Sequence, residues 1–133
     1  MSGRRVVHPD AIARIRAGER DHRFFFEVDK GTESPRKFQL KIERYARFWL
    51  SGAWTSEFPI FPEIRIMTTQ EPRVRKLLDA CNYVGKSFHQ WGRGAFEDNV
   101  YVAVAREQDF LANPLGAIWR PAFTQQERKD RLL

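Results

Sequence analysis

The chain has a single cysteine and no apolar run long enough to cross a membrane. Cys81 alone can build neither a disulfide framework nor a cysteine-based zinc site. Such sparse use of cysteine fits a reducing compartment, for which the cytoplasm is the default. Every apolar run falls well short of the roughly 18 residues that a transmembrane helix needs. These absences predict a soluble, cytoplasmic protein with no membrane partner.

Acidic residues are also in the minority. The 133 residues include 23 Lys and Arg against 17 Asp and Glu, which gives a formal net charge of +6. An excess of cations favours polyanionic partners, because binding releases the counterions condensed on them. The alternative is a basic surface that only keeps the protein soluble. The arginines are spread along the chain, so no localisation signal or basic arm stands out.

The length predicts one domain over residues 1–133, with mobile tails at 1–5 and 124–133. Alternating and apolar segments at residues 6–15 and 22–29, joined by a polar turn, predict a β-hairpin. Pro35 follows a candidate N-cap, Ser34, and starts a helix that Ser51 and Gly52 end. Its apolar stripe is built from Phe38, Ile42, Tyr45 and Trp49.

Further along, strand 63–69, a helix from about 71 to 83 that ends before Gly85, strand 100–104 and a helical turn at 107–112 follow. The order hairpin, helix, strand, helix, strand predicts an α/β domain. Its central sheet should be mixed and flanked by helices, because the hairpin is antiparallel while helical crossovers join parallel strands.

Acidic side chains cluster at the end of the second predicted strand. Alternation along that strand places Phe25, Glu27 and Asp29 on one face. Carboxylates there are costly unless they are paired or bound to a cation. Asp10 on the neighbouring strand comes level with them if the register permits, which would create an oxygen site for Mg²⁺ or Mn²⁺. The alternative is an exposed strand end whose acids pair with Arg or Lys.

The dipeptide Pro9-Asp10, residues 25–34 (FFEVDKGTES) and a helix carrying Tyr45 resemble the replication-relaxation family. That family is a branch of the PD-(D/E)xK, restriction-endonuclease-like nucleases of plasmids and mobile elements. A weaker similarity continues through Thr68-Thr69, the helix with Arg73 and Arg75, and residues 113–119. The resemblance implies a restriction-endonuclease-like core and a DNA-acting protein with Asp10 and Glu27 as metal ligands.

One position departs from the superfamily pattern. Asp29 stands where the catalytic lysine is usual, and strand alternation directs Lys30 to the opposite face. Lysines of the following helix are the candidate replacements, and Lys41, which flanks the apolar stripe, is a better choice than Lys37. We therefore expect Asp10, Glu27, Asp29 and Lys41 to be catalytic, with Asp29 acting as a third metal ligand or a base. A lysine would stabilise charge developing on the phosphoryl group.

Four cations are candidate DNA contacts: Lys37, Arg73, Arg75 and Arg93. Two functions other than metal-dependent nuclease stay open at this point. One is a catalytically inactive DNA-binding module. The other is an interaction domain that recruits replication or relaxase proteins through exposed aromatics such as Trp54 and Trp119. Dimers are common among nucleases of this superfamily, so a homodimer is compatible with the nuclease function.

Overall fold

The computed structural model describes residues 7–123 and 129–133. Its main feature is a five-stranded mixed sheet with the strand order β1-β2-β3-β6-β7. Strands β1 (Ala11–Ala17) and β2 (Arg20–Val28) form the predicted antiparallel hairpin. Strands β3 (Glu63–Thr68) and β6 (Val102–Arg106) continue the sheet in parallel, and β7 (Arg120–Pro121) closes it antiparallel to β6. The predicted mixed α/β class is confirmed.

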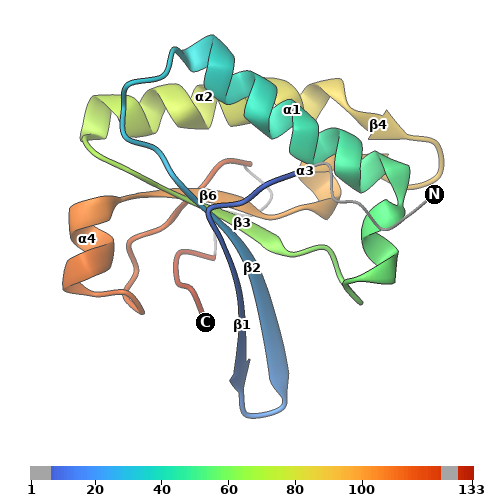
Figure 1. Cartoon of the computed structure of the whole chain (residues 1–133), viewed down its shortest axis with the longest axis horizontal. Coiled ribbons are helices and arrows are strands. Elements are labelled where there is room, and N and C mark those ends of the chain that lie inside the picture. The colour runs from blue at the N-terminus through green and yellow to red at the C-terminus, as the bar shows by residue number, and fades with distance from the viewer. Residues whose placement is uncertain (1–6, 124–128) are drawn as a thin grey trace.

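Two long helices cover one face of this sheet (Figure 1). Helix α1 (Pro35–Ser51) connects β2 to β3, and α2 (Glu71–Ser87) connects β3 to β6. Both crossovers step across the sheet in the same direction, so the right-handed rule places both helices on the same side. The core on this side contains Phe25, Ile64 and Val102 from the strands.

The start and stop signals of α1 act as predicted. Ser34 accepts a hydrogen bond from the Lys37 amide, and Pro35 occupies the first turn. Gly52 takes a left-handed conformation with φ +73° and ends the helix. The predicted stripe of four residues is buried against the sheet. Burial of this stripe fixes the rotation of α1 about its own axis. This rotation sets the direction of the polar side chains that lie beside the stripe.

Helix α2 is longer than predicted. Gly85 does not end it but lies inside its last turn, where a Cβ would come within 2.4 Å of the Phe123 ring. The glycine is therefore explained by close packing rather than by a helix end. The residues between α2 and β6, where the sequence patterns predict a loop over 85–99, contain a small hairpin, β4 (His89–Gln90) and β5 (Gly94–Ala95), and a short helix, α3 (Phe96–Asn99). The 53–62 loop contains a 3₁₀ turn, η1 (Ala53–Ser56).

The second face of the sheet has a smaller apolar cluster. Phe24 and Phe26 pack there with Trp119 and Leu132, beside α4 (Glu107–Ala112). Arg65 is fully buried among the rings of Phe24, Tyr101 and Trp119 and donates to the Arg131 carbonyl. Residues 129–133, part of one segment expected to be a mobile tail, thus contact this face. Residues 1–5 and 124–128 of those segments lie outside the described residues.

No helix in the described ranges 7–123 and 129–133 is long and apolar enough to span a bilayer.

Candidate functional site

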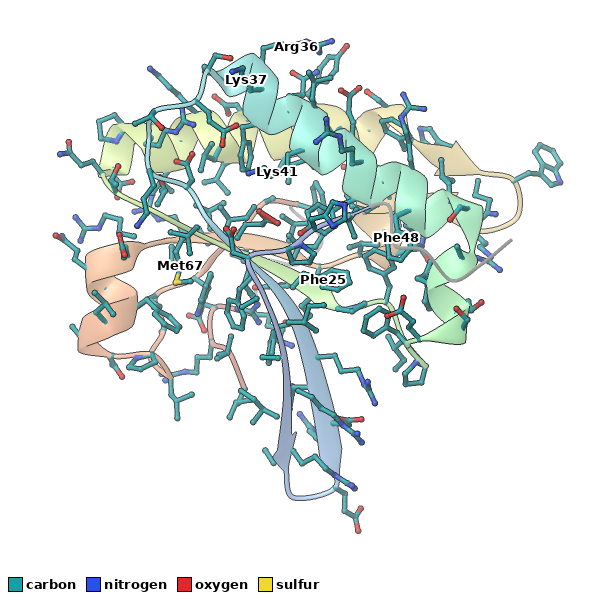
Figure 2. The ribbon with its side chains drawn as sticks, viewed as in Figure 1. Phe25, Arg36, Lys37, Lys41, Phe48 and Met67 are labelled. Atoms are coloured by element: carbon teal, nitrogen blue, oxygen red, sulfur yellow. The ribbon has the colours of Figure 1, made fainter. Side chains whose placement is uncertain are left out.

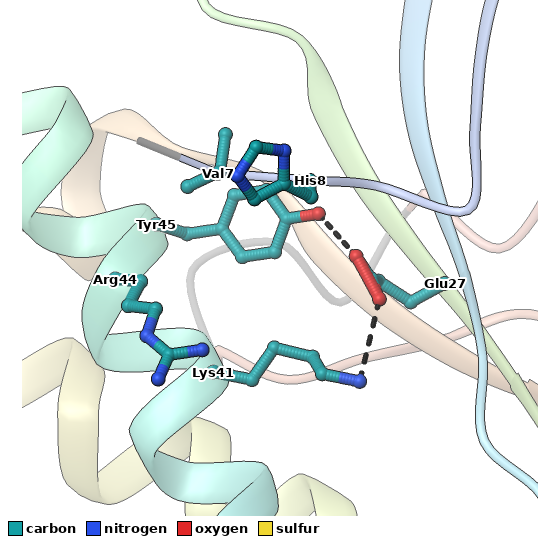
Figure 3. Close-up of a pocket in the computed structure, with 6 residues that line it drawn as sticks. All are labelled: Val7, His8, Glu27, Lys41, Arg44 and Tyr45. Atoms are coloured by element: carbon teal, nitrogen blue, oxygen red, sulfur yellow. Dashed lines mark hydrogen bonds and ion pairs between the residues drawn. The ribbon is translucent and has the colours of Figure 1, made fainter. Parts of the chain in front are cut away.

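An open pocket of about 320 Å³ lies between the end of β2 and helix α1 (Figure 3). Glu27 from β2 is its acidic member, and Lys41, Arg44 and Tyr45 reach it from α1. Val7 and His8, which precede β1, complete the lining. The helix residues come together because positions 41, 44 and 45 are one turn apart on the side of α1 beside the buried stripe.

Glu27 is almost completely buried, and both of its oxygens have partners. The Tyr45 hydroxyl donates to Oε2 at 2.5 Å. Lys41 Nζ lies 3.6 Å from Oε1 and also pairs with Glu33 at 3.5 Å. Lys41 therefore occupies the position beside Glu27 that its place on the helix predicted. Its catalytic role stays a prediction.

The environment of Glu27 disfavours its negative charge. Burial raises the pKa of this carboxyl above its usual value, and the nearby Asp10 adds to the effect. The Tyr45 hydrogen bond and the Lys41 ammonium act in the opposite direction without cancelling it. A further positive charge in the pocket would relieve this imbalance.

Asp10 lies one position beyond the last pair of the β1–β2 ladder, in which Ala11 faces Phe26. Its Oδ2 accepts a hydrogen bond from the Val28 amide at 2.7 Å, which holds the side chain beside the end of β2. The expected approach of Asp10 to Glu27 across the hairpin is thus present. Asp10 stays exposed to solvent.

Asp29 pairs with an arginine, as the alternative interpretation of the strand end expected, but it is buried instead of exposed. Arg73 from α2 donates two hydrogen bonds to it, both at 2.8 Å, and the Thr68 hydroxyl donates a third at 2.5 Å. Burial raises the pKa of Asp29, but the bonds from Arg73 and Thr68 outweigh it, and the net pKa is lowered. The paired guanidinium has its own pKa raised by the same hydrogen bonds.

The three acids do not gather into one cluster, since Asp29 is bound by Arg73 at the α2 side. Across residues 7–123 and 129–133, no group of three or more His, Cys, Asp or Glu side chains could hold a metal ion. What remains is a pair of carboxylates: Glu27, which lines the pocket, and the exposed Asp10, which lies near it at the end of β2. Mg²⁺ is commonly held by one or two carboxylates, with water and substrate phosphate completing its shell, so this pair fits such an ion.

The predicted DNA contacts are scattered. Lys37, Arg75 and Arg93 are exposed, on α1, on α2 and in the β4–β5 turn respectively. Figure 2 shows Lys37 on the outer part of α1, away from the sheet. Arg73 is instead bound to Asp29 through two of its nitrogens, which leaves it poorly placed for phosphate.

The aromatics proposed for partner recruitment are not exposed as expected. Trp119 is buried under the second face of the sheet, and Trp54 packs partly against the main core. The prediction that these two tryptophans are exposed contacts for a partner is therefore wrong. Among the described residues it is Trp91, in the β4–β5 turn, that is fully exposed.

Sequence reasoning missed Tyr45 as a partner of Glu27 and Arg44 as a pocket residue. It had assigned Tyr45 to the core, where its ring does lie. The four-residue spacing of Lys41 and Tyr45 was the available signal, because a lysine that reaches Glu27 from α1 brings the tyrosine one turn later to the same carboxylate.

A model of the replication-relaxation family matches residues 1–64, just under half of the chain. The resemblance drawn from the motifs is confirmed over this part, which contains Asp10, Glu27, Lys41 and Tyr45. The weaker similarity expected after residue 64 lies outside the match, and the PD-(D/E)xK assignment stays a prediction. No curated protein and no solved structure matches the chain.

Proposed function

We propose that this chain acts on DNA during replication of a plasmid or another mobile element, and that its pocket hydrolyses phosphodiester bonds with Mg²⁺ or Mn²⁺. The observation that carries the proposal is the meeting of Glu27 with Lys41 in an open pocket beside Asp10. The match to the replication-relaxation family over the same residues supports the biological setting.

Asp10 and Glu27 would hold the ion. When bound, a divalent cation polarises a phosphate and makes a water molecule more acidic. The raised pKa of Glu27 supports this assignment, because a buried carboxylate short of positive charge gains from a cation. Asp29 takes no part as ligand or base in this proposal, since Arg73 and Thr68 already bind it.

Lys41 has the role that the superfamily pattern gives to a lysine on the strand. Its ammonium lies 3.6 Å from Glu27 Oε1, so a phosphate bound in the pocket would be within its reach. A fixed positive charge there stabilises the negative charge that develops on phosphoryl oxygens during attack. Tyr45 orients Glu27 by its hydrogen bond and so fixes the ligand.

The test is Mg²⁺- or Mn²⁺-dependent nicking of supercoiled plasmid. Glu27→Gln keeps the shape of the side chain and removes its charge, and we expect cleavage to fall on the order of 100-fold. The matched control is Glu33→Gln, which pairs with the same Lys41 but lies on the surface outside the pocket. Cleavage that persists in Glu27→Gln, or that falls equally in the control, contradicts the assignment.

One observation favours a second candidate, a catalytically inactive DNA-binding module. Lys41 already forms an ion pair with Glu27, and the position two residues after Glu27 is an acid bound to Arg73 instead of a free lysine. This candidate predicts salt-sensitive DNA affinity without any effect of divalent metal. Titration calorimetry with Mn²⁺ separates the two candidates. The nuclease predicts a heat of Mn²⁺ binding that Glu27→Gln abolishes, whereas the inactive DNA-binding module predicts no such heat.

A further inference from the structure

The far half of the β1–β2 hairpin, residues 14–23, projects from the body of the protein (Figure 1). We call it the arm. Pairing of β2 with β3 begins only at Phe24, so the arm is a two-stranded ribbon held by its own ladder. Its residues are exposed or half-buried. A two-stranded ribbon without further packing is only marginally stable in water. The length of the arm is therefore poorly explained by a contribution to the stability of the fold.

Arginines concentrate on one side of the arm. The register places Arg14 opposite Arg23 and Arg16 opposite Asp21, and residues opposite each other share a face. The other side carries Ile15, Ala17 and His22, with Arg20 at the turn. Strand alternation puts Arg23 on the same face as Phe25 and Glu27. The arginine side is therefore the side of the sheet on which the Glu27 pocket opens.

The charge on that side is not balanced within the arm. Asp21 accepts from Arg14 at 2.9 Å and from Arg23 at 3.3 Å, so one carboxylate serves two guanidinium groups. Arg16 has no ion pair among the described residues. Like charges directly opposite each other destabilise a ladder, and exposed ion pairs are weak enough to exchange for other anions. Arginine in addition binds phosphate with a planar fork of donors.

We propose that the arginine side of the arm, Arg14, Arg16 and Arg23, contacts backbone phosphates of duplex DNA next to the Glu27 pocket. The inference rests on the proposed function for its choice of DNA. At about 3.3 Å per residue, the Arg14–Arg23 pair lies about 13 Å along the strand from Glu27 and Arg16 about 20 Å. These lengths correspond to about four to six base-pair steps of duplex. A two-stranded ribbon also fits the major groove.

The arm supplies a matched pair of variants for the test. Arg16→Ala and Arg20→Ala each remove one positive charge from the exposed end of the same hairpin, on opposite faces. Affinity for a duplex is measured by fluorescence anisotropy over a salt series with EDTA present, so that no metal-dependent step contributes. The slope of log K against log salt is negative, and one lost phosphate contact reduces its magnitude by about 0.9. We expect that change for Arg16→Ala and no change for Arg20→Ala.

The double variant Arg14→Ala/Arg16→Ala should show twice the effect. Between about 50 and about 200 mM salt, the wild-type chain should lose about tenfold more affinity than this variant. The variant Arg14→Lys/Arg16→Lys should keep the wild-type slope, since it keeps both charges. Circular dichroism of each variant checks the fold. Equal slopes for all variants, equal loss in Arg20→Ala, or no affinity of the wild-type chain for duplex would overturn the proposal.

Plasmid nicking measured in parallel separates this inference from the proposed function. A chain that shows the arm contrast without cleavage supports the arm and removes the nuclease. A chain that nicks plasmid while Arg16→Ala and Arg20→Ala bind alike overturns the arm and leaves the nuclease in place.

Discussion

Glu27 and Asp29 are two acids from adjacent positions on one face of the same strand end, and the fold treats them differently. Asp29 has a complete set of partners in Arg73 and Thr68, and its pKa is lowered. Glu27 has a hydroxyl and a shared lysine, and its pKa is raised. The first arrangement satisfies a buried charge, while the second leaves one short of compensation inside a pocket. Position on the strand alone therefore does not determine how completely the charge of each acid is compensated.

The largest expected effect follows from removing Asp29. In Asp29→Ala the Arg73 side chain, 11% exposed, loses its carboxylate. Breaking a buried pair at one partner costs about 3 kcal/mol of unfolding free energy, because it leaves an uncompensated charge. Denaturant unfolding measures the change. Glu107→Ala, which removes the partner of Lys30 in an exposed pair at 3.9 Å, is the control and should cost under about 1 kcal/mol. Similar costs for the two would contradict the contrast between the acids.

Tyr45→Phe tests how much the Tyr45 hydrogen bond stabilises the charged form of Glu27. The change removes the hydroxyl that donates to Oε2 while keeping the ring in the core. A hydrogen bond to a charged group contributes about 1.5 kcal/mol, so we expect a loss of that size and a further rise in the pKa of Glu27. NMR titration of the Glu27 carboxyl measures the pKa. Tyr83→Phe on the exposed face of α2 should change neither quantity.

The pH dependence of stability should have opposite signs at the two acids. The pKa of Glu27 is raised from 4.5 in the folded chain, so its favourable contribution is complete below 4.5 and is lost as pH rises through the folded value. The pKa of Asp29 is lowered from 3.8, so its contribution is present above 3.8 and is lost as pH falls. Compared with the wild type, Glu27→Gln should gain stability on raising the pH, and Asp29→Asn should gain it on lowering the pH.

Thermal unfolding of these two variants and the wild type across acidic and neutral pH measures both trends. A stability difference that stays constant with pH in either variant would show that the corresponding acid has the same pKa folded and unfolded. The contrast between the environments of Glu27 and Asp29 would then be contradicted at that residue.

Local signals in the sequence predicted the parts of the fold that local physics controls. Ser34, Pro35 and Gly52 mark the ends of α1 because caps act over a few residues, and the apolar stripe fixes the rotation that turns Lys41 toward β2. Alternation placed Glu27 on the helix-covered face. These features required no knowledge of distant segments.

The corrections come from contacts between distant segments. The partner of Asp29 is 44 residues away on another helix, so spacing within the motif could not identify it. Gly85 resembles a helix end unless the Phe123 ring is known to lie against it. Trp119 looked exposed because the cluster that buries it includes Leu132 from the end of the chain.

The register of the hairpin has a consequence for how the protein can change. Glu27 is held from its other side by parallel pairing with Ile66, while the turn at Gly18 and Glu19 lies at the far end of the hairpin, beyond the residues that pair with β3. Adding one residue pair beside the turn would lengthen the ribbon by about 3.4 Å without moving the acid. A pair added beyond Ala17 and Arg20 would lie on the arginine side of the arm, and a second added pair would lie on the opposite side. The length of the arm can therefore change by single pairs, while the face that the last pair occupies alternates with each addition. Hairpin length is thus a dimension in which relatives can diverge while the pocket stays the same.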